Sequence, residues 1–128
     1  HHQLVLIAGR PSDVPFNTIN QFSCKLDDLA TLRRYLPILS AHGVADIAQV
    51  DHGNAWSMYF PDPETNTIEL YVDTPFYSPQ PCREPLDLTQ SESEILACTE
   101  AMCRQRPGFM TREQWQTGLR ERIATTRR

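Results

Sequence analysis

Two hydrophobic periods alternate along residues 18–72, and the order in which they occur is the strongest constraint on the fold of this chain. Residues 18–26 alternate polar and apolar side chains with period two, which is typical of a strand. Leucines then recur at helical spacing from Leu29 to Leu39. Three further segments with strand character follow, at residues 45–50, 56–60 and 67–72. The order strand, helix, strand, strand, strand predicts a compact α+β unit, a βαβββ module with its helix on one face of the sheet.

Capping residues stand at both ends of the predicted helix. Asp27 or Asp28 can accept hydrogen bonds from the free amides of the first turn, and Gly43 suits the left-handed conformation that often follows a helix. Pro37 lies inside the leucine pattern. Because proline lacks an amide proton and clashes with the carbonyl four residues before it, we expect a kink or a break near Leu36.

The segments outside the helix and its strands read as connections and edges. Residues 3–8 have the pattern of a strand, and residues 9–16 that of a loop. Residues 61–66 form a tight connection in which Asn66 is expected to take positive φ. Prolines interrupt residues 75–85, which predicts a segment that wraps the surface, docked on the sheet or laid over a pocket as a lid.

The end of the chain is predicted to be helical. Residues 92–105 form one helix, capped by Ser91, and residues 112–124 form a second. Thr111 and Gln114 fit the capping box of this second helix. We therefore divide the chain into residues 1–77, which hold the strands and the first helix, and residues 78–128, a proline-rich wrap followed by two helices.

Composition excludes several classes of function. The net charge is −4 and no basic stripe is present, so we expect no nucleic-acid partner. No apolar run approaches the roughly 20 residues of a membrane span and no signal peptide is evident, so we expect no membrane contact and a cytoplasmic location. The four cysteines have no CxxC or zinc-ligand spacing, and we expect them to be reduced; they are Cys24, Cys82, Cys98 and Cys103.

The residues that carry chemistry are concentrated in residues 51–71. On the strand at residues 67–72, alternation places Glu69 on the face opposite Ile68 and Leu70. Spacing alone favours a solvent-facing glutamate there, since charged residues are mostly exposed. On the strand at residues 18–26, the same alternation places Gln21 on the face opposite Phe22.

The sequence of this stretch resembles the closing hairpin of the vicinal oxygen chelate superfamily, which includes glyoxalase I, bleomycin resistance proteins and extradiol ring-cleaving dioxygenases. The residues that carry the resemblance are His52-Gly53, Ser57-Met58-Tyr59-Phe60, Asp62-Pro63, Asn66 and Ile68-Glu69-Leu70-Tyr71. The superfamily is built from paired βαβββ modules whose curved sheets enclose a metal. The resemblance implies that Glu69 is a metal ligand.

The nearer match is to extradiol dioxygenases, and it covers residues 1–8 and about 17–77. In those enzymes a His and a Tyr before the ligand Glu line the substrate pocket, and His52 and Tyr59 match them. His1 and His2 resemble a His-His pair at the start of a strand, one of which is the acid/base residue. The resemblance therefore implies cleavage of a small catechol-type aromatic with O₂ and a divalent metal, Fe(II), which two His and one carboxylate hold with positions left open for substrate and O₂.

This chain departs from the family pattern at two points. Gln21 stands where the family has a ligand His; an amide oxygen can bind a metal, but it is a poorer ligand for Fe(II) than imidazole. The resemblance also places a third ligand in a first module, of which only the last strand, residues 3–8, corresponds to this chain.

Several alternatives stay open. A metal-independent protein that binds a small molecule on the same fold would suit Gln21, and a glyoxalase-like lyase or isomerase would suit the Gln21–Glu69 pair. His1 and His2 also fit the remnant of an affinity tag. His42 reads as a helix-capping cation, while His52 and Tyr59 could be a strand-end polar residue and a packing residue. Since a lone module leaves sheet edges open, we expect a homodimer or pairing with an unseen first module.

Overall fold

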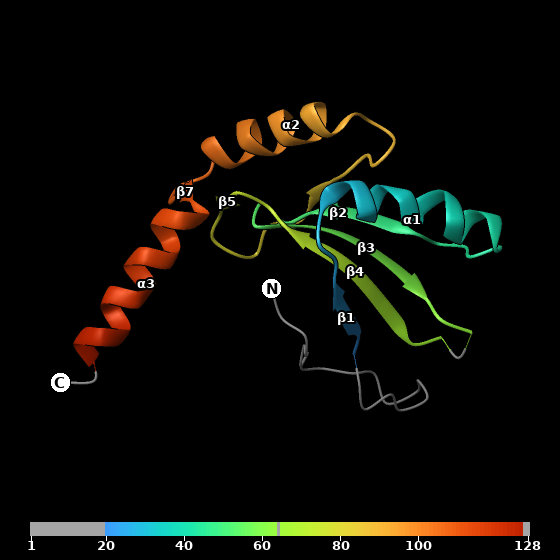
Figure 1. Ribbon diagram of the computed structural model, residues 1–128, viewed down its shortest axis with the longest axis horizontal. Helices are drawn as coiled ribbons and strands as arrows, with labels where there is room; N and C mark the ends of the chain where they lie inside the picture. The colour runs from blue at the N-terminus through green and yellow to red at the C-terminus, as the bar shows by residue number, and fades with distance from the viewer. Residues whose placement is uncertain (1–19, 64, 127–128) are drawn as a thin grey trace.

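The computed structural model describes residues 20–63 and 65–126, which form an α+β fold with a mixed five-stranded sheet and three helices (Figure 1). The sheet strands are β1 (Phe22–Lys25), β2 (Ala48–Asp51), β3 (Ala55–Pro61), β4 (Thr67–Asp73) and β6 (Glu84–Pro85). The helices are α1 (Leu29–Ala41), α2 (Glu92–Arg104) and α3 (Arg112–Thr126). Two short strands, β5 (Phe76–Tyr77) and β7 (Met110–Thr111), pair with each other. The predicted order of strand, helix and three strands is confirmed.

The sheet has the strand order β1-β4-β3-β2-β6. β1 runs parallel to β4, whereas β4, β3, β2 and β6 are paired antiparallel. The first strand of the unit is therefore inserted beside the last, which places Ser23 of β1 opposite Glu69 of β4. On the other side of β4, Tyr59 of β3 lies opposite the same glutamate. Glu69 consequently has a neighbour on each side on one face of the sheet.

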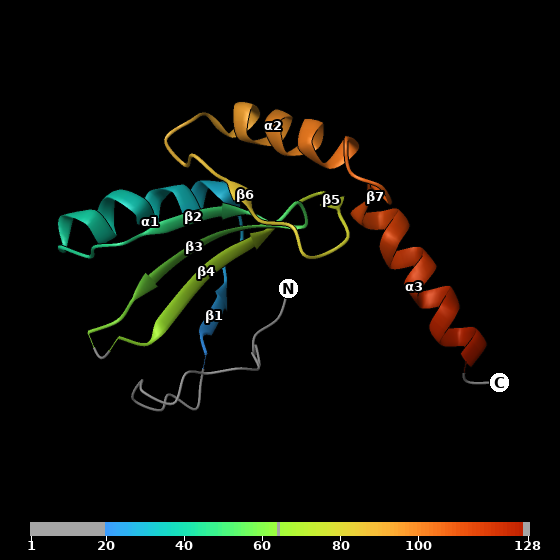
Figure 2. The same cartoon turned by 180° about the vertical axis from the view of Figure 1, so that it is seen from behind.

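The hydrophobic core lies between the other face of the sheet and helices α1 and α2 (Figure 2). Its buried members are Leu29, Leu32, Trp56, Met58, Val72, Leu88 and Ile95. This cluster joins side chains from both sides of residue 77, so the C-terminal segment packs on the same core as the strands.

Helix α3 leads away from the sheet (Figure 1), and none of its described residues is buried. No helix in the described part of the chain is long and apolar enough to cross a membrane.

The predicted caps are confirmed. Asp28 caps α1 and accepts a hydrogen bond from the Thr31 amide at 2.7 Å, and Gly43 follows the helix with φ of 76°. Ser91 and Glu94 form a reciprocal capping box at the start of α2. At the start of α3, Gln114 N donates to Thr111 Oγ and Thr111 N donates to Gln114 Oε1.

The break predicted near Leu36, as one alternative to a kink, is wrong, and so is the residue predicted to take positive φ. Helix α1 continues through Pro37 to Ala41, so no break occurs near Leu36; its leucines pack on the core on both sides of the proline, and this packing outweighs one lost hydrogen bond. In the β3–β4 connection Thr65, not Asn66, takes positive φ, at 67°. Asn66 is instead held by Asp62, which accepts hydrogen bonds from its backbone and side-chain nitrogens.

The proline-rich segment docks on the sheet, which is one of the two predicted alternatives. Its strand β6 pairs with β2 and forms an edge of the five-stranded sheet, and Cys82 and Leu88 are buried. Arg112, at the start of α3, forms an ion pair with Asp73 at 2.7 Å. The predicted strand and loop at residues 3–16 lie outside the described residues.

Candidate functional site

Four of the six side chains that the sequence predicts as a site form one continuous hydrogen-bonded chain on the face of the sheet opposite the core. Gln21 Nε2 donates to Glu69 Oε2 at 2.9 Å. Tyr59 OH donates to Glu69 Oε1 at 2.5 Å. His52 Nε2 lies 2.9 Å from Tyr59 OH. We call this set the carboxylate relay. Its members are Gln21, just before β1, Glu69 of β4, Tyr59 of β3 and His52 of the β2–β3 turn.

Glu69 is the centre of the relay and is completely buried. The solvent-facing glutamate that spacing alone favours is therefore wrong. A buried carboxylate is costly unless hydrogen bonds compensate its lost hydration, and here donors reach both oxygens: Gln21 and Ser23 reach Oε2, and Tyr59 reaches Oε1. Gln21 Nε2 also donates to Ser23 Oγ at 2.8 Å. Strand register supplies this environment, because Ser23 and Tyr59 are the two cross-strand neighbours of Glu69.

His52 is positioned by the turn that follows β2. Its backbone amide donates to the Ala55 carbonyl at 2.8 Å, and its ring Nδ1 lies 2.6 Å from the Cys82 carbonyl. A carbonyl oxygen only accepts, so Nδ1 must carry a proton. The ring meets the Tyr59 ring edge-on, with centroids 6.1 Å apart and planes at 85°. The docked proline-rich segment thus holds Nδ1 of His52, and Tyr59 of β3 holds Nε2.

The hydrogen bonds of the relay restrict where its protons can sit. When Tyr59 donates its single proton to Glu69, its oxygen accepts from His52 Nε2–H, and His52 is doubly protonated. In the second arrangement, His52 Nε2 carries no proton and accepts the proton of Tyr59. The Tyr59 oxygen can then only accept from Glu69, so the Glu69 carboxyl group must be protonated. The two arrangements differ by transfer of one proton from one end of the relay to the other, so the geometry suits acid/base chemistry.

Tyr59 is kept neutral by its surroundings. Burial is the main cause that raises the pKa of Tyr59 well above its usual range, and the hydrogen bond to Glu69 and the glutamate charge raise it further. The guanidinium of Arg83 lies 5.6 Å from the centroid of the Tyr59 ring, and its charge lowers the pKa in the opposite sense. Tyr59 therefore acts in this site as a proton donor and acceptor, and not as a phenolate.

The ligand role of Gln21 and Glu69 can be tested against their separation. Gln21 Nε2 is 2.9 Å from Glu69 Oε2. A half-turn of the Gln21 amide group would exchange its nitrogen and oxygen, and would put Oε1 at about this distance from Glu69 Oε2. Two neighbouring oxygen ligands at about 2.1 Å from an octahedral cation are about 3.0 Å apart. After this exchange the two oxygens would have a spacing that two ligands of one divalent cation can share, which is also the spacing of a hydrogen-bonded pair. In the described part of the chain, no three His, Cys, Asp or Glu side chains gather as a metal-binding group.

Other candidate residues lie elsewhere. His1 and His2 are outside the described residues. His42 is the C-cap of α1, with Nδ1 2.8 Å from the Ile38 carbonyl, as expected of a helix-capping residue. All four cysteines are free, as predicted. Burial raises the pKa of Cys82 and raises that of Cys103 to about 11, so these two thiols are poor nucleophiles near neutral pH.

Sequence reasoning missed three contributors to the site. Ser23 shares a strand face with Gln21, so alternation could have identified it. Arg83 and the Cys82 carbonyl come from the proline-rich segment, whose docking position has no local sequence signal. Their contacts with Tyr59 and His52 depend on the pairing of β6 with β2.

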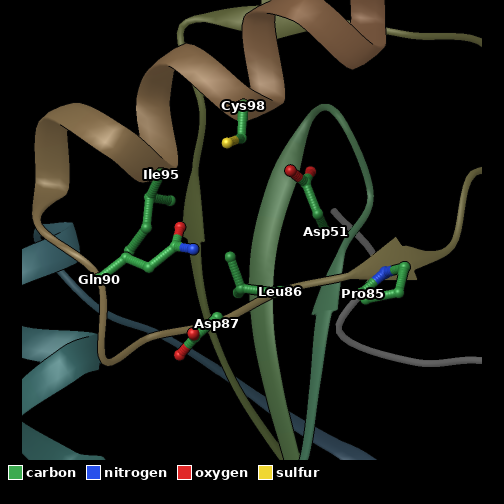
Figure 3. Close-up of a pocket in the computed structure, with 7 residues that line it drawn as sticks. All are labelled: Asp51, Pro85, Leu86, Asp87, Gln90, Ile95 and Cys98. Carbon is green, nitrogen blue, oxygen red and sulfur yellow. The ribbon is translucent and has the colours of Figure 1, made fainter.

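A pocket of about 290 Å³ lies between β2 and α2, away from the relay (Figure 3). It is lined by Asp51, Pro85, Leu86, Asp87, Gln90, Ile95 and Cys98.

The Asp51 carboxylate accepts hydrogen bonds from Gly53 N at 2.7 Å and from Thr99 Oγ, so it tethers the β2–β3 turn to α2. Burial is the main cause that raises the pKa of Asp51. These partners make Asp51 a structural group of the core.

Comparisons of the chain with protein-family models, with curated proteins and with solved structures find no match.

Proposed function

We propose that this chain is a metal-dependent enzyme module of the vicinal oxygen chelate type that cleaves a small catechol-type aromatic with O₂. The observation that carries the proposal is the carboxylate relay, because the residues that the family resemblance selects, Gln21, His52, Tyr59 and Glu69, are far apart in sequence and are hydrogen-bonded to one another in the fold. The order and pairing of β1, α1, β2, β3 and β4 support the same proposal.

The proposed roles follow from the positions of the side chains. Gln21 and Glu69 would hold a divalent metal, Fe(II) by the resemblance, which supplies coordination positions for the two oxygens of a catecholate and for O₂. His52 and Tyr59 take up and return a substrate proton, because one proton can move between the two ends of the relay. Ser23 keeps the buried carboxylate oriented.

A second candidate is a protein that binds a small molecule without a metal. One observation favours it: both oxygens of Glu69 already accept hydrogen bonds from protein groups, so the carboxylate is compensated without a cation. A glyoxalase-like lyase or isomerase is a third candidate, favoured by the adjacent oxygen-bearing side chains of Gln21 and Glu69, which suit a harder divalent metal than Fe(II).

We also propose that the module pairs with a second copy of itself or with a further module. Strand β1 is an edge of the sheet among the described strands, and Glu69 lies one strand inside that edge. Exposed strand edges are usually covered by pairing. Light scattering coupled to size-exclusion chromatography tests this, with twice the 14.7 kDa chain mass expected for a homodimer.

The experiment that tests the function is metal analysis of protein purified without chelators, followed by O₂-uptake measurements with 2,3-dihydroxybiphenyl. We expect stoichiometric iron and a yellow ring-cleavage product. Tyr59→Phe should lower the turnover at least about tenfold, because it removes the proton at the centre of the relay. Tyr35→Phe, on the exposed side of α1, is the matched control and should leave turnover unchanged.

The alternative outcomes separate the candidates. A bound divalent metal together with isomerisation of a thiohemiacetal and no O₂ uptake would support the glyoxalase-like enzyme. Ligand binding by a protein that takes up no metal under any reconstitution condition would overturn both enzyme proposals and support the metal-independent binding protein.

A further inference from the structure

Three sulfur atoms from two separate segments meet behind the β2–β3 turn. Cys82 lies between β5 and β6, and Met102 and Cys103 lie in the last turn of α2. Cys82 Sγ is 3.8 Å from Met102 Sδ. A Cβ atom placed on Gly53 would lie 3.6 Å from Cys82 Sγ and 3.0 Å from Cys103 Sγ, so both thiols face the same point. We call Cys82, Met102 and Cys103 the sulfur cluster.

One sulfur–sulfur distance in the sulfur cluster equals that between two ligands of one metal ion. For a metal–sulfur bond of about 2.3 Å, two sulfur ligands at a tetrahedral angle are about 3.8 Å apart. Cys82 Sγ and Met102 Sδ already have this separation. Cys82 and Cys103 are only 2% and 0% exposed, and neither is in a disulfide. Two buried thiols that face the same point, with a thioether in contact with one of them, therefore bring three soft ligands to one place in the fold.

A buried hydroxyl lies beside the same cluster. Ser78 is completely buried, and its hydroxyl lies close enough to the Cys82 thiol to lower the pKa of that thiol. A Cβ atom placed on Gly53 would also lie 2.8 Å from Ser78 Cβ, so Ser78 borders the same point that Cys82 and Cys103 face. A thiolate on Cys82 would be a better acceptor for this hydroxyl than the thiol, and metal binding creates that thiolate.

The types of ligand atom in the sulfur cluster favour one metal over others. Thiolate and thioether sulfurs are soft ligands that favour Cu(I). Zinc sites in proteins use thiolates, imidazoles and carboxylates, so Met102 argues for copper. We propose that Cys82, Met102 and Cys103 form a binding site for Cu(I), separate from the Gln21–Glu69 pair and independent of the proposed function.

The binding step balances without an oxidant or a reductant. Two S–H bonds are replaced by two S–Cu bonds, the two protons pass to solvent, and the copper remains Cu(I). The resulting complex carries one negative charge. The guanidinium of Arg106, which follows α2, donates to the Pro81 carbonyl, next to Cys82, at 2.8 Å, and its charge acts on both thiols, so a cation is held close to that charge.

The test uses the full chain under anaerobic, reducing conditions, in competition with a chromophoric Cu(I) chelator such as bicinchoninate. Cys24→Ser and Cys98→Ser form the background, because both thiols are exposed and would bind copper themselves. We expect this background to take one Cu(I) per chain. Adding Cys82→Ser or Cys103→Ser should lower the affinity about a hundredfold or more, and Met102→Leu about tenfold. No Cu(I) uptake by the background, or equal affinity in all variants, would overturn the proposal.

A second measurement covers the case in which a serine variant does not fold. Met102→Leu exchanges apolar side chains of similar size and is expected to fold, which circular dichroism checks. X-ray absorption of the copper-loaded background should show a shell of sulfur alone, and Met102→Leu should remove one sulfur neighbour. A shell with nitrogen or oxygen ligands, or one that Met102→Leu leaves unchanged, would contradict the proposed site.

Discussion

Tyr59 and Glu69 lie directly opposite each other on β3 and β4, and the tyrosine hydroxyl donates a 2.5 Å hydrogen bond to the buried carboxylate. Their relative position is set by the pairing of two seven-residue strands and not by a loop. His52 extends this pair toward the docked proline-rich segment, and Gln21 extends it toward β1. Because sites held by strands keep their geometry well, substitutions at this pair should report on both stability and function.

Tyr59→Phe should destabilise the protein. The substitution keeps the ring and removes the hydrogen bond that the Tyr59 hydroxyl donates to Glu69 Oε1, so the buried carboxylate loses part of its compensation. We expect the free energy of unfolding to fall by about 2 kcal/mol. Urea unfolding measures it, with Tyr35→Phe on α1 as the control, which should change the value by less than about 0.5 kcal/mol. Equal effects of the two substitutions would contradict the importance of this hydrogen bond.

The same residue should give the protein a distinctive alkaline instability. Burial and Glu69 raise the pKa of Tyr59 in the folded state, whereas in the unfolded chain it ionises near pH 10. The unfolded state then binds fewer protons than the folded state, so the contribution of Tyr59 to stability is complete below about pH 10 and is lost as the pH rises further. Urea midpoints measured from pH 9 to pH 11 should fall more steeply for wild type than for Tyr59→Phe. Parallel curves would show that Tyr59 titrates normally.

Two glycines with similar backbone conformations should respond differently to alanine. Gly43 and Gly53 have φ of 76° and 72°. A Cβ on Gly43 meets nothing within 4 Å, whereas one on Gly53 would lie 2.8 Å from Ser78 Cβ and 3.0 Å from Cys103 Sγ. Gly43→Ala should cost about 1 kcal/mol, from backbone strain alone. Gly53→Ala adds a steric clash and should cost about 3 kcal/mol. Thermal or urea unfolding compares them, and equal losses would mean that the β2–β3 turn is not packed as described.

Asp51→Asn should be tolerated better than Asp51→Ala. In the asparagine variant the side-chain oxygen can still accept from Gly53, and its amide can donate to Thr99, whose hydroxyl then donates to the Ile95 carbonyl at 2.9 Å. Alanine would leave the buried Gly53 amide without its acceptor. We expect a loss of about 1 kcal/mol or less for asparagine and about 1–3 kcal/mol for alanine, measured by urea unfolding. A larger loss for asparagine would contradict this network.

The pH dependence of the asparagine variant follows from the direction of the shift. The pKa of Asp51 is raised in the folded state, chiefly by burial. Its contribution to stability is therefore complete below its ordinary pKa of about 3.9 and declines as the pH rises through the raised value. Wild type should lose stability relative to Asp51→Asn as the pH increases from about 4 toward neutrality. A constant difference over this range would contradict the raised pKa.

Local sequence rules predicted the elements and part of the site because both depend on near neighbours. Alternation placed Gln21 and Glu69 on faces that the structure brings together, and the caps at Asp28, Ser91 and Gly43 follow from single turns of chain. The family resemblance added His52 and Tyr59, whose hydrogen bond joins residues seven positions apart.

The features that the sequence did not predict depend on distant packing. Spacing alone favoured exposure of Glu69, yet its burial reflects two adjacent strands that supply compensating donors. Core contacts on both sides of Pro37 keep α1 continuous, although the local rule favours a break. The contact of Arg83 with Tyr59 exists only because the proline-rich segment docks on β2. None of these outcomes has a signal within a few residues of the position concerned.

The central claim is that Gln21 and Glu69 are ligands of one divalent metal, and the most direct test is an anaerobic Fe(II) titration of wild type, Glu69→Gln and Gln21→His. Imidazole is a better ligand for Fe(II) than an amide oxygen, so Gln21→His should bind Fe(II) at least about tenfold more tightly than wild type, and Glu69→Gln at least about tenfold more weakly. Equal affinities of the three proteins, or Fe(II) binding that Gln21→His leaves unchanged, would contradict the proposed metal site.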